Sequence, residues 1–280
     1  MDIPEMDPER LDAQLNKTAT ERVSEPRRPA PKWSVNAAPP YRLNVPLERV
    51  ALFLDIDGTL APITERPEFT RVPLSTRRTL IRLEGAGVAV AALSGRPLTQ
   101  VRRLLLPLKI PVGGSHGAQI GPGPGLSIRV AKGVPPSLLD VLQQGVQRLP
   151  GVWLERKPAA VAVHWRQAQE WRSEVEALVT SAVRQVQGWR VVRGHCVHEL
   201  KPAGRNKGVA LRWFMSQSGF RGRWPLAIGD DRTDEDAFSA ALTLGGGAIR
   251  IGAFDATVAP WRLPNVEALA SWLKHLLHAG

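Results

Sequence analysis

The sequence has 280 residues, 43% of them apolar, and is long enough to bury a sizeable core in one large domain or two coupled smaller ones. Its formal net charge is +11, which by itself would suit nucleic acid, an anionic membrane surface or a negatively charged substrate. Cys196 is the only cysteine, which excludes an intrachain disulfide and a cysteine-based zinc site and favours a reducing compartment.

Neither a membrane span nor a signal peptide is expected. The longest small or apolar run, residues 86–93, is far shorter than the roughly 20 residues that a spanning helix needs. The first ten residues are acidic and contain prolines, unlike the basic and then apolar start of a secreted protein. We therefore expect a cytoplasmic protein without a membrane partner.

Residues 1–45 differ in composition from the rest of the chain. They hold seven of the 24 prolines, seven basic and seven acidic residues, and few large apolar side chains, so we expect a flexible N-terminal arm. The positive excess lies in residues 46–280, where it is dispersed rather than clustered. This distribution favours a solvated basic surface, with nucleic-acid binding as the alternative.

The first predicted elements after the arm alternate between strand and helix, and each apolar strand ends in a polar segment. In chain order they are a strand at 50–54 ending in Asp55-Ile-Asp57-Gly-Thr59, a helix at 74–84, a strand at 88–93 ending in Ser94-Gly95-Arg96, a helix at 97–105 and a strand at 111–113 running into Gly114-Ser-His116-Gly117.

The pattern changes between Gly121 and Pro202, where shorter strands of alternating polarity indicate an inserted domain. We expect strands at 153–157, 160–166, 189–193 and 196–201 and a helix at 168–186. The first pattern then resumes with a helix at 206–218, a strand at 225–228 ending in Gly229-Asp230-Asp231, a helix after Thr233, a strand at 248–251 and a helix at 266–277.

This alternation predicts an α/β fold, namely a doubly wound, Rossmann-like parallel sheet with a smaller α/β domain inserted into it. The expected division is an arm at 1–45, a core at 46–120 and 203–280, and the inserted domain at 121–202. Ligands of such sheets bind at the carboxyl ends of the strands, where the polar segments lie.

Asp55 and Asp57 form the strongest chemical signal. An aspartate nucleophile can divide phosphate-ester cleavage into formation and hydrolysis of an aspartyl-phosphate, while its partner protonates the leaving alcohol and later deprotonates water. Asp230 and Asp231 add carboxylates at another strand end, and such oxygens are preferred by Mg²⁺. Asp234 could join them, or could belong to first-turn acids of a helix capped by Thr233.

A phosphoryl group also needs donors and positive charge. The Ser94 hydroxyl, with the adjacent backbone at Gly95, could bind its oxygens, and Lys207 just inside a predicted helix could neutralise its charge. Each residue alone is a weak signal, because a serine after a strand often caps a helix and a lysine at a helix start is often solvated.

The order Asp-x-Asp-Gly-Thr, Ser-Gly-Arg, Lys and Gly-Asp-Asp resembles the four motifs of the haloacid-dehalogenase-like phosphatases. Four longer segments narrow the resemblance to the trehalose-6-phosphate phosphatase family, and together the likeness covers about residues 47–275. These segments are residues 54–63, 114–118, 164–166 and 229–238.

The resemblance implies Mg²⁺-dependent hydrolysis of trehalose 6-phosphate through an aspartyl-phosphate, beneath a closing cap. It implies Mg²⁺ bound by Asp55, the backbone of Asp57 and Asp230, with Asp231 or Asp234 beside them. Implied substrate contacts are Arg96, His116, Gly117, Glu155, Lys157, His164, Arg166 and Glu199. One departure is Glu199-Leu-Lys201-Pro in place of the expected Glu-x-Arg-Pro, so a bidentate arginine contact would be weaker here.

The partner expected from this resemblance is a small sugar phosphate, and not nucleic acid. We expect a monomer, with any trehalose-phosphate synthase on a separate chain. The alternatives are a related phosphatase or mutase acting on sucrose, mannosyl or hexose phosphates, a catalytically silent sugar-phosphate sensor, and a basic nucleic-acid-binding protein.

Overall fold

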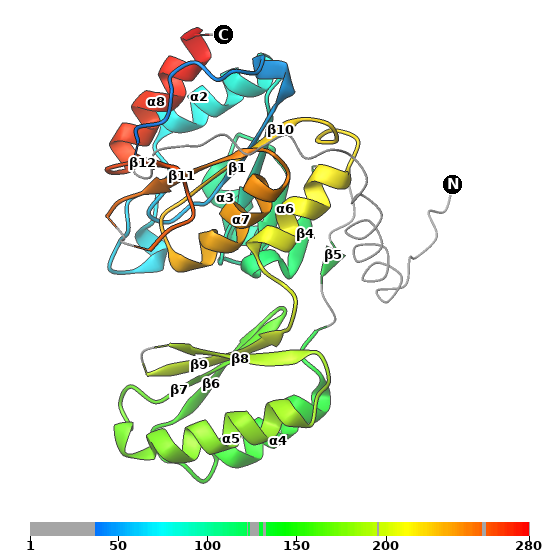
Figure 1. Ribbon diagram of the computed structural model, residues 1–280. Coiled ribbons are helices and arrows are strands. Elements are labelled where there is room, and N and C mark those ends of the chain that lie inside the picture. The colour runs from blue at the N-terminus through cyan, green and yellow to red at the C-terminus, as the bar shows by residue number, and fades with distance from the viewer. Residues whose placement is uncertain are drawn as a thin grey trace.

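The computed structural model describes residues 37–121, 123, 129–130, 133–194, 196–253 and 256–279. Its larger body is built on an eight-stranded sheet with the order β12-β11-β10-β1-β2-β3-β4-β5 (Figure 1). Six strands run parallel: β1 (Val50–Leu54), β2 (Ala89–Leu93), β3 (Val112–Gly114), β10 (Trp224–Gly229), β11 (Gly247–Ile251) and β12 (Trp261–Leu263). The antiparallel strands β4 (Gln119–Gly121) and β5 (Arg129–Val130) complete the sheet.

Helices cover both faces of this sheet, because alternate residues of its apolar strands point to opposite sides. Leu52 and Leu54 of β1 pack in the cluster formed with α2 (Leu74–Gly85), α3 (Leu98–Leu105) and α8 (Val266–Ala279). Phe53 packs on the other face with α6 (Lys207–Ser216) and α7 (Glu235–Thr243). The prediction of a doubly wound parallel sheet is therefore confirmed.

The smaller body is a four-stranded antiparallel sheet with two helices on one face. Its strand order is β6-β7-β9-β8, and Figure 1 shows this sheet lying between its own helices and the larger body. Its elements are β6 (Trp153–Lys157), β7 (Ala160–His164), β8 (Trp189–Gly194), β9 (Val197–Pro202), α4 (Pro136–Val146) and α5 (Arg172–Arg184). We call this body the cap and the larger body the core.

Short connecting helices complete the part of the chain that the structure describes. They are η1 (Leu47–Arg49), η2 (Pro67–Phe69), η3 (Ser115–Gly117), η4 (Gln169–Trp171) and η5 (Arg232–Asp234). Helix α4 was not expected from the sequence, although Leu138 and Leu142 supply it with a buried apolar stripe. Strand β12 was not expected either. The three residues of β12 are too few for a periodic signal.

Two expected boundaries differ from the structure. The core sheet includes Gly121 of β4 and the strand β5 (Arg129–Val130), which were expected in the inserted domain. A flexible arm is wrong for residues 37–45, because Leu43 is buried and the Trp272 indole donates to the Pro40 carbonyl at 3.1 Å. Residues 1–36 lie outside the described residues. Among the described residues, no helix is both long enough and apolar enough to cross a membrane.

Candidate active site

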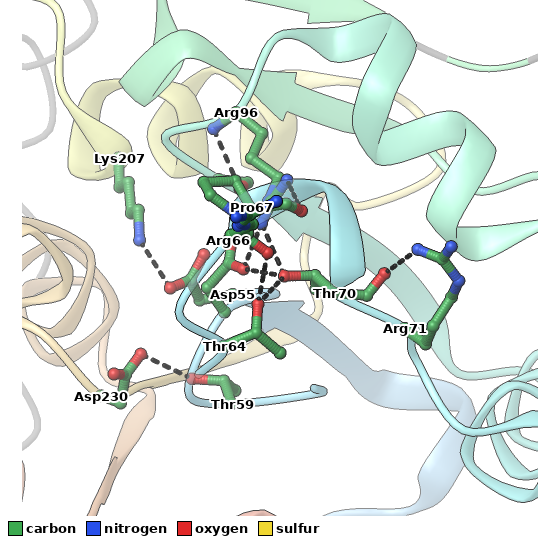
Figure 2. A network of polar contacts seen from close by, with 12 residues as sticks. Asp55, Thr59, Thr64, Arg66, Pro67, Thr70, Arg71, Arg96, Lys207 and Asp230 are labelled. Carbon is green, nitrogen blue, oxygen red and sulfur yellow. Dashed lines mark hydrogen bonds and ion pairs between the residues drawn. The ribbon is translucent and has the colours of Figure 1, made fainter. Parts of the chain in front are cut away.

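The strand register brings the acidic segments together at one edge of the core sheet. β1 pairs in parallel with β10, so that Leu54 lies opposite Ile228 and the Asp55 amide donates to the Ile228 carbonyl at 3.0 Å. Asp55 and Asp230, 175 residues apart, therefore follow neighbouring strand ends. Figure 2 shows Lys207 pointing to Asp55, with Asp230 and Thr59 close by.

Three carboxylates gather around one buried lysine. Asp55, Asp230 and Asp234 each offer an oxygen, and these oxygens all lie within 4.8 Å of one another. The Lys207 Nζ lies 3.1 Å from Asp55 Oδ2 and 2.8 Å from Asp234 Oδ1, and only 2% of this lysine is exposed. The lysine thus neutralises part, but not all, of the negative charge.

The pKa values of all three acids are raised, chiefly by burial. Burial raises the pKa of Asp55 to about 6, although Lys207 opposes this shift. Burial also raises the pKa of Asp230 to about 6, and the neighbouring Asp234 and Asp231 add to the effect. The pKa of Asp234 is raised in the same way by burial and by Asp55. Each acid would ionise more readily beside an added cation.

The donor set fits Mg²⁺. It consists of carboxylate oxygens, which this hard cation prefers, and the turn after β1 leaves room for them. Gly58 has a φ of +73°, and a Cβ on it would lie 2.0 Å from the Asp230 Oδ2 atom. A glycine at this position therefore allows the Asp230 carboxylate to approach the Asp57-Gly58 backbone.

Asp57 and Asp55 contact different residues. The Arg96 Nε and Nη2 atoms donate to the two Asp57 carboxylate oxygens at 2.6 Å each. The Thr70 hydroxyl donates to Asp57 Oδ1 at 3.1 Å. It also accepts from Arg96 Nη2 at 2.7 Å, while Arg96 Nη1 donates to the Pro67 carbonyl at 3.0 Å (Figure 2). Arg96 thus holds Asp57, and sequence reasoning missed Thr70 altogether.

Ser94, at the end of β2, is buried, and its hydroxyl accepts the Arg96 amide at 3.2 Å. A Cβ on Gly95 would lie 2.7 Å from the His116 ring, so this glycine allows the ring to cover the strand end. Gly117 similarly approaches the carbonyl of Asn206, the residue whose side chain caps α6 ahead of Lys207.

The pKa of His116 responds to charged groups of both the core and the cap. Burial, Lys201 of the cap and Lys207 of the core lower its pKa to about 4, outweighing the opposite effects of Glu199 and Asp231. The imidazole is therefore neutral near pH 7. Charged groups of the cap, Glu199 and Lys201, and of the core, Lys207 and Asp231, thus act on the same imidazole.

The two acids left open by the sequence have different surroundings. Asp234 belongs to the carboxylate cluster. The carboxylate of Asp231 instead accepts from the Thr233 amide at 2.8 Å and its hydroxyl at 2.7 Å, so that Asp231, and not Thr233, is the residue that caps this helical turn. Burial would raise the pKa of Asp231, but Lys207 and the hydrogen bonds from Thr233 lower it.

The cap face opposite α4 and α5 carries a continuous polar network. The Lys157 Nζ lies 2.8 Å from Glu199 Oε1 and 3.7 Å from Glu155 Oε2, and His164 Nε2 lies 3.1 Å from the same Glu155 oxygen. Lys201 Nζ lies 4.0 Å from Glu199 Oε2. Four of the sugar-contact candidates, Glu155, Lys157, His164 and Glu199, are therefore neighbours.

Arg166 does not continue this face. The strand β7 ends at His164, and Arg166 lies exposed in the following turn, where its carbonyl accepts from the Gln169 side chain at 3.4 Å. The expectation that Arg166 shares a strand face with His164 was wrong, because the period-2 pattern cannot show where a strand ends.

Comparisons with known proteins identify the family. The family model for trehalose-phosphatase matches residues 53–266. Trehalose-6-phosphate phosphatase of Escherichia coli (strain K12) is 36% identical over 237 residues, which cover 82% of this chain and 88% of the relative.

Two solved structures share the fold. The structure of Aspergillus fumigatus trehalose-6-phosphate phosphatase has a TM-score of 0.67 at 23% identity, covering 88% of this chain and 100% of that one. A haloacid dehalogenase-like hydrolase from Bacteroides thetaiotaomicron has a TM-score of 0.65 at 16% identity, covering 81% and 99%. The extent of the family match, together with the Escherichia coli relative, decides the assignment: the chain belongs to the trehalose-phosphatase family.

Proposed function

We propose that the chain hydrolyses trehalose 6-phosphate to trehalose and phosphate, with Asp55 as the nucleophile. The observation that carries the proposal is the cluster of Asp55, Asp230 and Asp234 around buried Lys207, in a chain of this family. The substrate class is a small sugar phosphate. The cytoplasmic location, the monomeric state and a separate synthase chain remain predictions.

Mg²⁺ would be held by Asp55, Asp230 and Asp234, with the backbone of Asp57 beside them. Bound there, it would neutralise negative charge on the phosphoryl group. Asp231 is the less suitable ligand, because its carboxylate does not belong to the cluster of facing oxygens formed by Asp55, Asp230 and Asp234.

The chain's own residues supply the remaining steps. An Asp55 oxygen attacks phosphorus, the bond to the sugar oxygen breaks, and Asp57 donates a proton to that oxygen. Asp57 then accepts a proton from water, which attacks the aspartyl-phosphate and releases phosphate and free Asp55. Lys207, the Ser94 hydroxyl and the backbone at Gly95 bind the phosphoryl oxygens, and Arg96 with Thr70 orients Asp57.

The sugar would bind to the polar face of the cap. Glu155, Lys157, His164 and Glu199 present acceptors and donors at fixed spacing, as recognition of neighbouring hydroxyl groups requires. His116 and Gly117 would form the core side of this site. Lys201 stands where the family pattern has an arginine. It supplies a positive charge at this position but cannot make the bidentate contact of an arginine.

The test is phosphate release from trehalose 6-phosphate, with and without Mg²⁺, beside glucose 6-phosphate and sucrose 6-phosphate. We expect trehalose 6-phosphate to be the best of the three and the reaction to require the cation. The folded Asp55→Asn variant should not turn over, and substantial activity in it would remove Asp55 from the nucleophile role. Glu199→Ala should raise KM for the sugar phosphate while sparing hydrolysis of an aryl phosphate. Preference for another sugar phosphate would contradict the proposed substrate.

A further inference from the structure

Trp153 is an exposed indole on the polar face of the cap. It is 53% exposed, whereas Trp165, Trp213, Trp261 and Trp272 are buried. An indole that stays in water does not gain the favourable free energy that burial of its apolar surface would give. Its position at the start of β6, on the same strand face as Glu155 and Lys157, also keeps it away from the cap's hydrophobic core.

The indole is held in place by its neighbours. Trp153 lies directly opposite His164 in the strand register, and the two rings are stacked with centroids 4.1 Å apart and an interplanar angle of 7°. The His164 ring is itself bonded to Glu155, through Nε2 at 3.1 Å. A flat apolar surface is thus fixed beside groups that can bind hydroxyls.

The position along the strand gives this surface a specific place in the site. Glu199 and Lys201 lie towards the end of β9 from which the chain returns to α6 of the core, and Lys157 contacts Glu199. Trp153 lies four residues before Lys157, which corresponds to about 13 Å of strand. This is comparable with the length of a disaccharide, so a sugar whose phosphate is at the core would reach Trp153 with its second ring.

The chemistry of a sugar ring suits this arrangement. A pyranose presents C–H groups on its faces and hydroxyls around its edge, so an aromatic ring can cover the face while charged side chains bind the edge. We propose that Trp153, supported by His164, determines specificity by receiving the sugar ring farther from the phosphate, and so favours disaccharide phosphates over hexose phosphates. This inference rests on the proposed function.

The test compares Trp153→Ala and Trp153→Phe with the wild type on three substrates. We expect Trp153→Ala to lower kcat/KM for trehalose 6-phosphate about tenfold, mainly through KM, because it removes the stacking surface. Activity on glucose 6-phosphate and on an aryl phosphate should stay unchanged, since neither has a second sugar ring. Trp153→Phe should retain most of the activity on trehalose 6-phosphate.

Leu244→Ala, a substitution at a 43% exposed apolar residue of the core, is the matched control and should behave as the wild type. A second measurement uses trehalose itself as an inhibitor of aryl-phosphate hydrolysis, and its inhibition constant should rise in Trp153→Ala. Unchanged kinetics on trehalose 6-phosphate, or an equal loss on all three substrates, would overturn the inference. A wild type inactive on trehalose 6-phosphate would instead overturn the proposed function.

Discussion

Lys207 is the residue on which the charge balance of the site depends. It is buried, and its ammonium group contacts both Asp55 and Asp234. Burial by itself would lower the pKa of Lys207, but the acids around it raise it, so the lysine stays charged. Its positive charge offsets the repulsion between the buried carboxylates, which can therefore lie close together.

Replacing Lys207 by methionine should therefore destabilise the metal-free protein. Removing one partner of a buried ion pair leaves uncompensated charge and costs about 3 kcal/mol or more in the free energy of unfolding. Urea unfolding in EDTA at pH 8 measures this loss. At pH 5 the loss should shrink, because the acids freed from the lysine can take up protons. Equal losses at both pH values would contradict this account.

The raised pKa values of Asp55 and Asp230 predict how stabilisation of the protein by Mg²⁺ depends on pH. In the metal-free protein the pKa values of Asp55 and Asp230 are raised to about 6, above their unfolded values. The resulting stabilisation is present at low pH and is lost as the pH rises through 6. Mg²⁺ favours the ionised acids, so its increase in melting temperature should be larger at pH 7.5 than at pH 5.

Differential scanning fluorimetry with and without MgCl₂ checks this expectation. Asp230→Asn should nearly abolish the Mg²⁺ shift at pH 7.5. Asp140→Asn, which changes an exposed acid on α4 of the cap, should leave the shift intact. A Mg²⁺ shift that is the same at both pH values would show that these acids do not bind the ion.

At the scale of elements, the site is built from the short turns that follow parallel strands. The turn after β1 directs Asp55 to Lys207 and Asp57 to Arg96, although the two acids are only two residues apart. The segment around η2 then returns to this turn through Thr70, whose hydroxyl bridges Asp57 and Arg96. This segment therefore orients the proposed acid and base.

Thr70→Val tests this role with little change in volume. Thr70 is buried, and loss of its hydroxyl removes a hydrogen bond to the Asp57 carboxylate. We expect kcat for trehalose 6-phosphate to fall about tenfold, since hydrogen bonds to charged groups contribute about 1.5–3 kcal/mol. An aryl phosphate with an acidic leaving group needs less protonation and should lose less activity. Thr70→Ser should restore the wild-type rate; equal losses on both substrates would indicate a purely structural role.

At the scale of the whole molecule, the core and the cap have separate hydrophobic interiors. The two clusters of the core and the cluster of the cap share no residue among those described. In the proposed function, the phosphate chemistry belongs to the core, and the cap supplies most of the sugar contacts. We therefore expect that stability and specificity can be changed in one body without disrupting the other.

Leu142→Ala in the cap should show this separation. Leu142 is fully buried on α4, and truncation of such a residue costs about 2–5 kcal/mol in local stability. The expected result is a raised KM for trehalose 6-phosphate with aryl-phosphate hydrolysis retained. The matched Leu83→Ala variant on α2 of the core should reduce both activities. If Leu142→Ala also abolished aryl-phosphate hydrolysis, the two bodies would not be independent.

The sequence by itself determined the alternating strands and helices of the core and the order of the acidic, serine, lysine and second acidic segments. These features are local, because burial on both faces of a sheet produces apolar runs and a strand end produces a polar turn. The same reasoning identified the face shared by Glu155 and Lys157, since strand periodicity alone places them together.

Only the tertiary structure decided where side chains point after the strands end. It grouped Asp234, and not Asp231, with Asp55 and Asp230, paired Arg96 with Asp57, and left Arg166 outside the cap face. It also packed residues 37–45 against the core. These outcomes depend on turn geometry and on contacts between distant segments, neither of which has a periodic signal in the sequence.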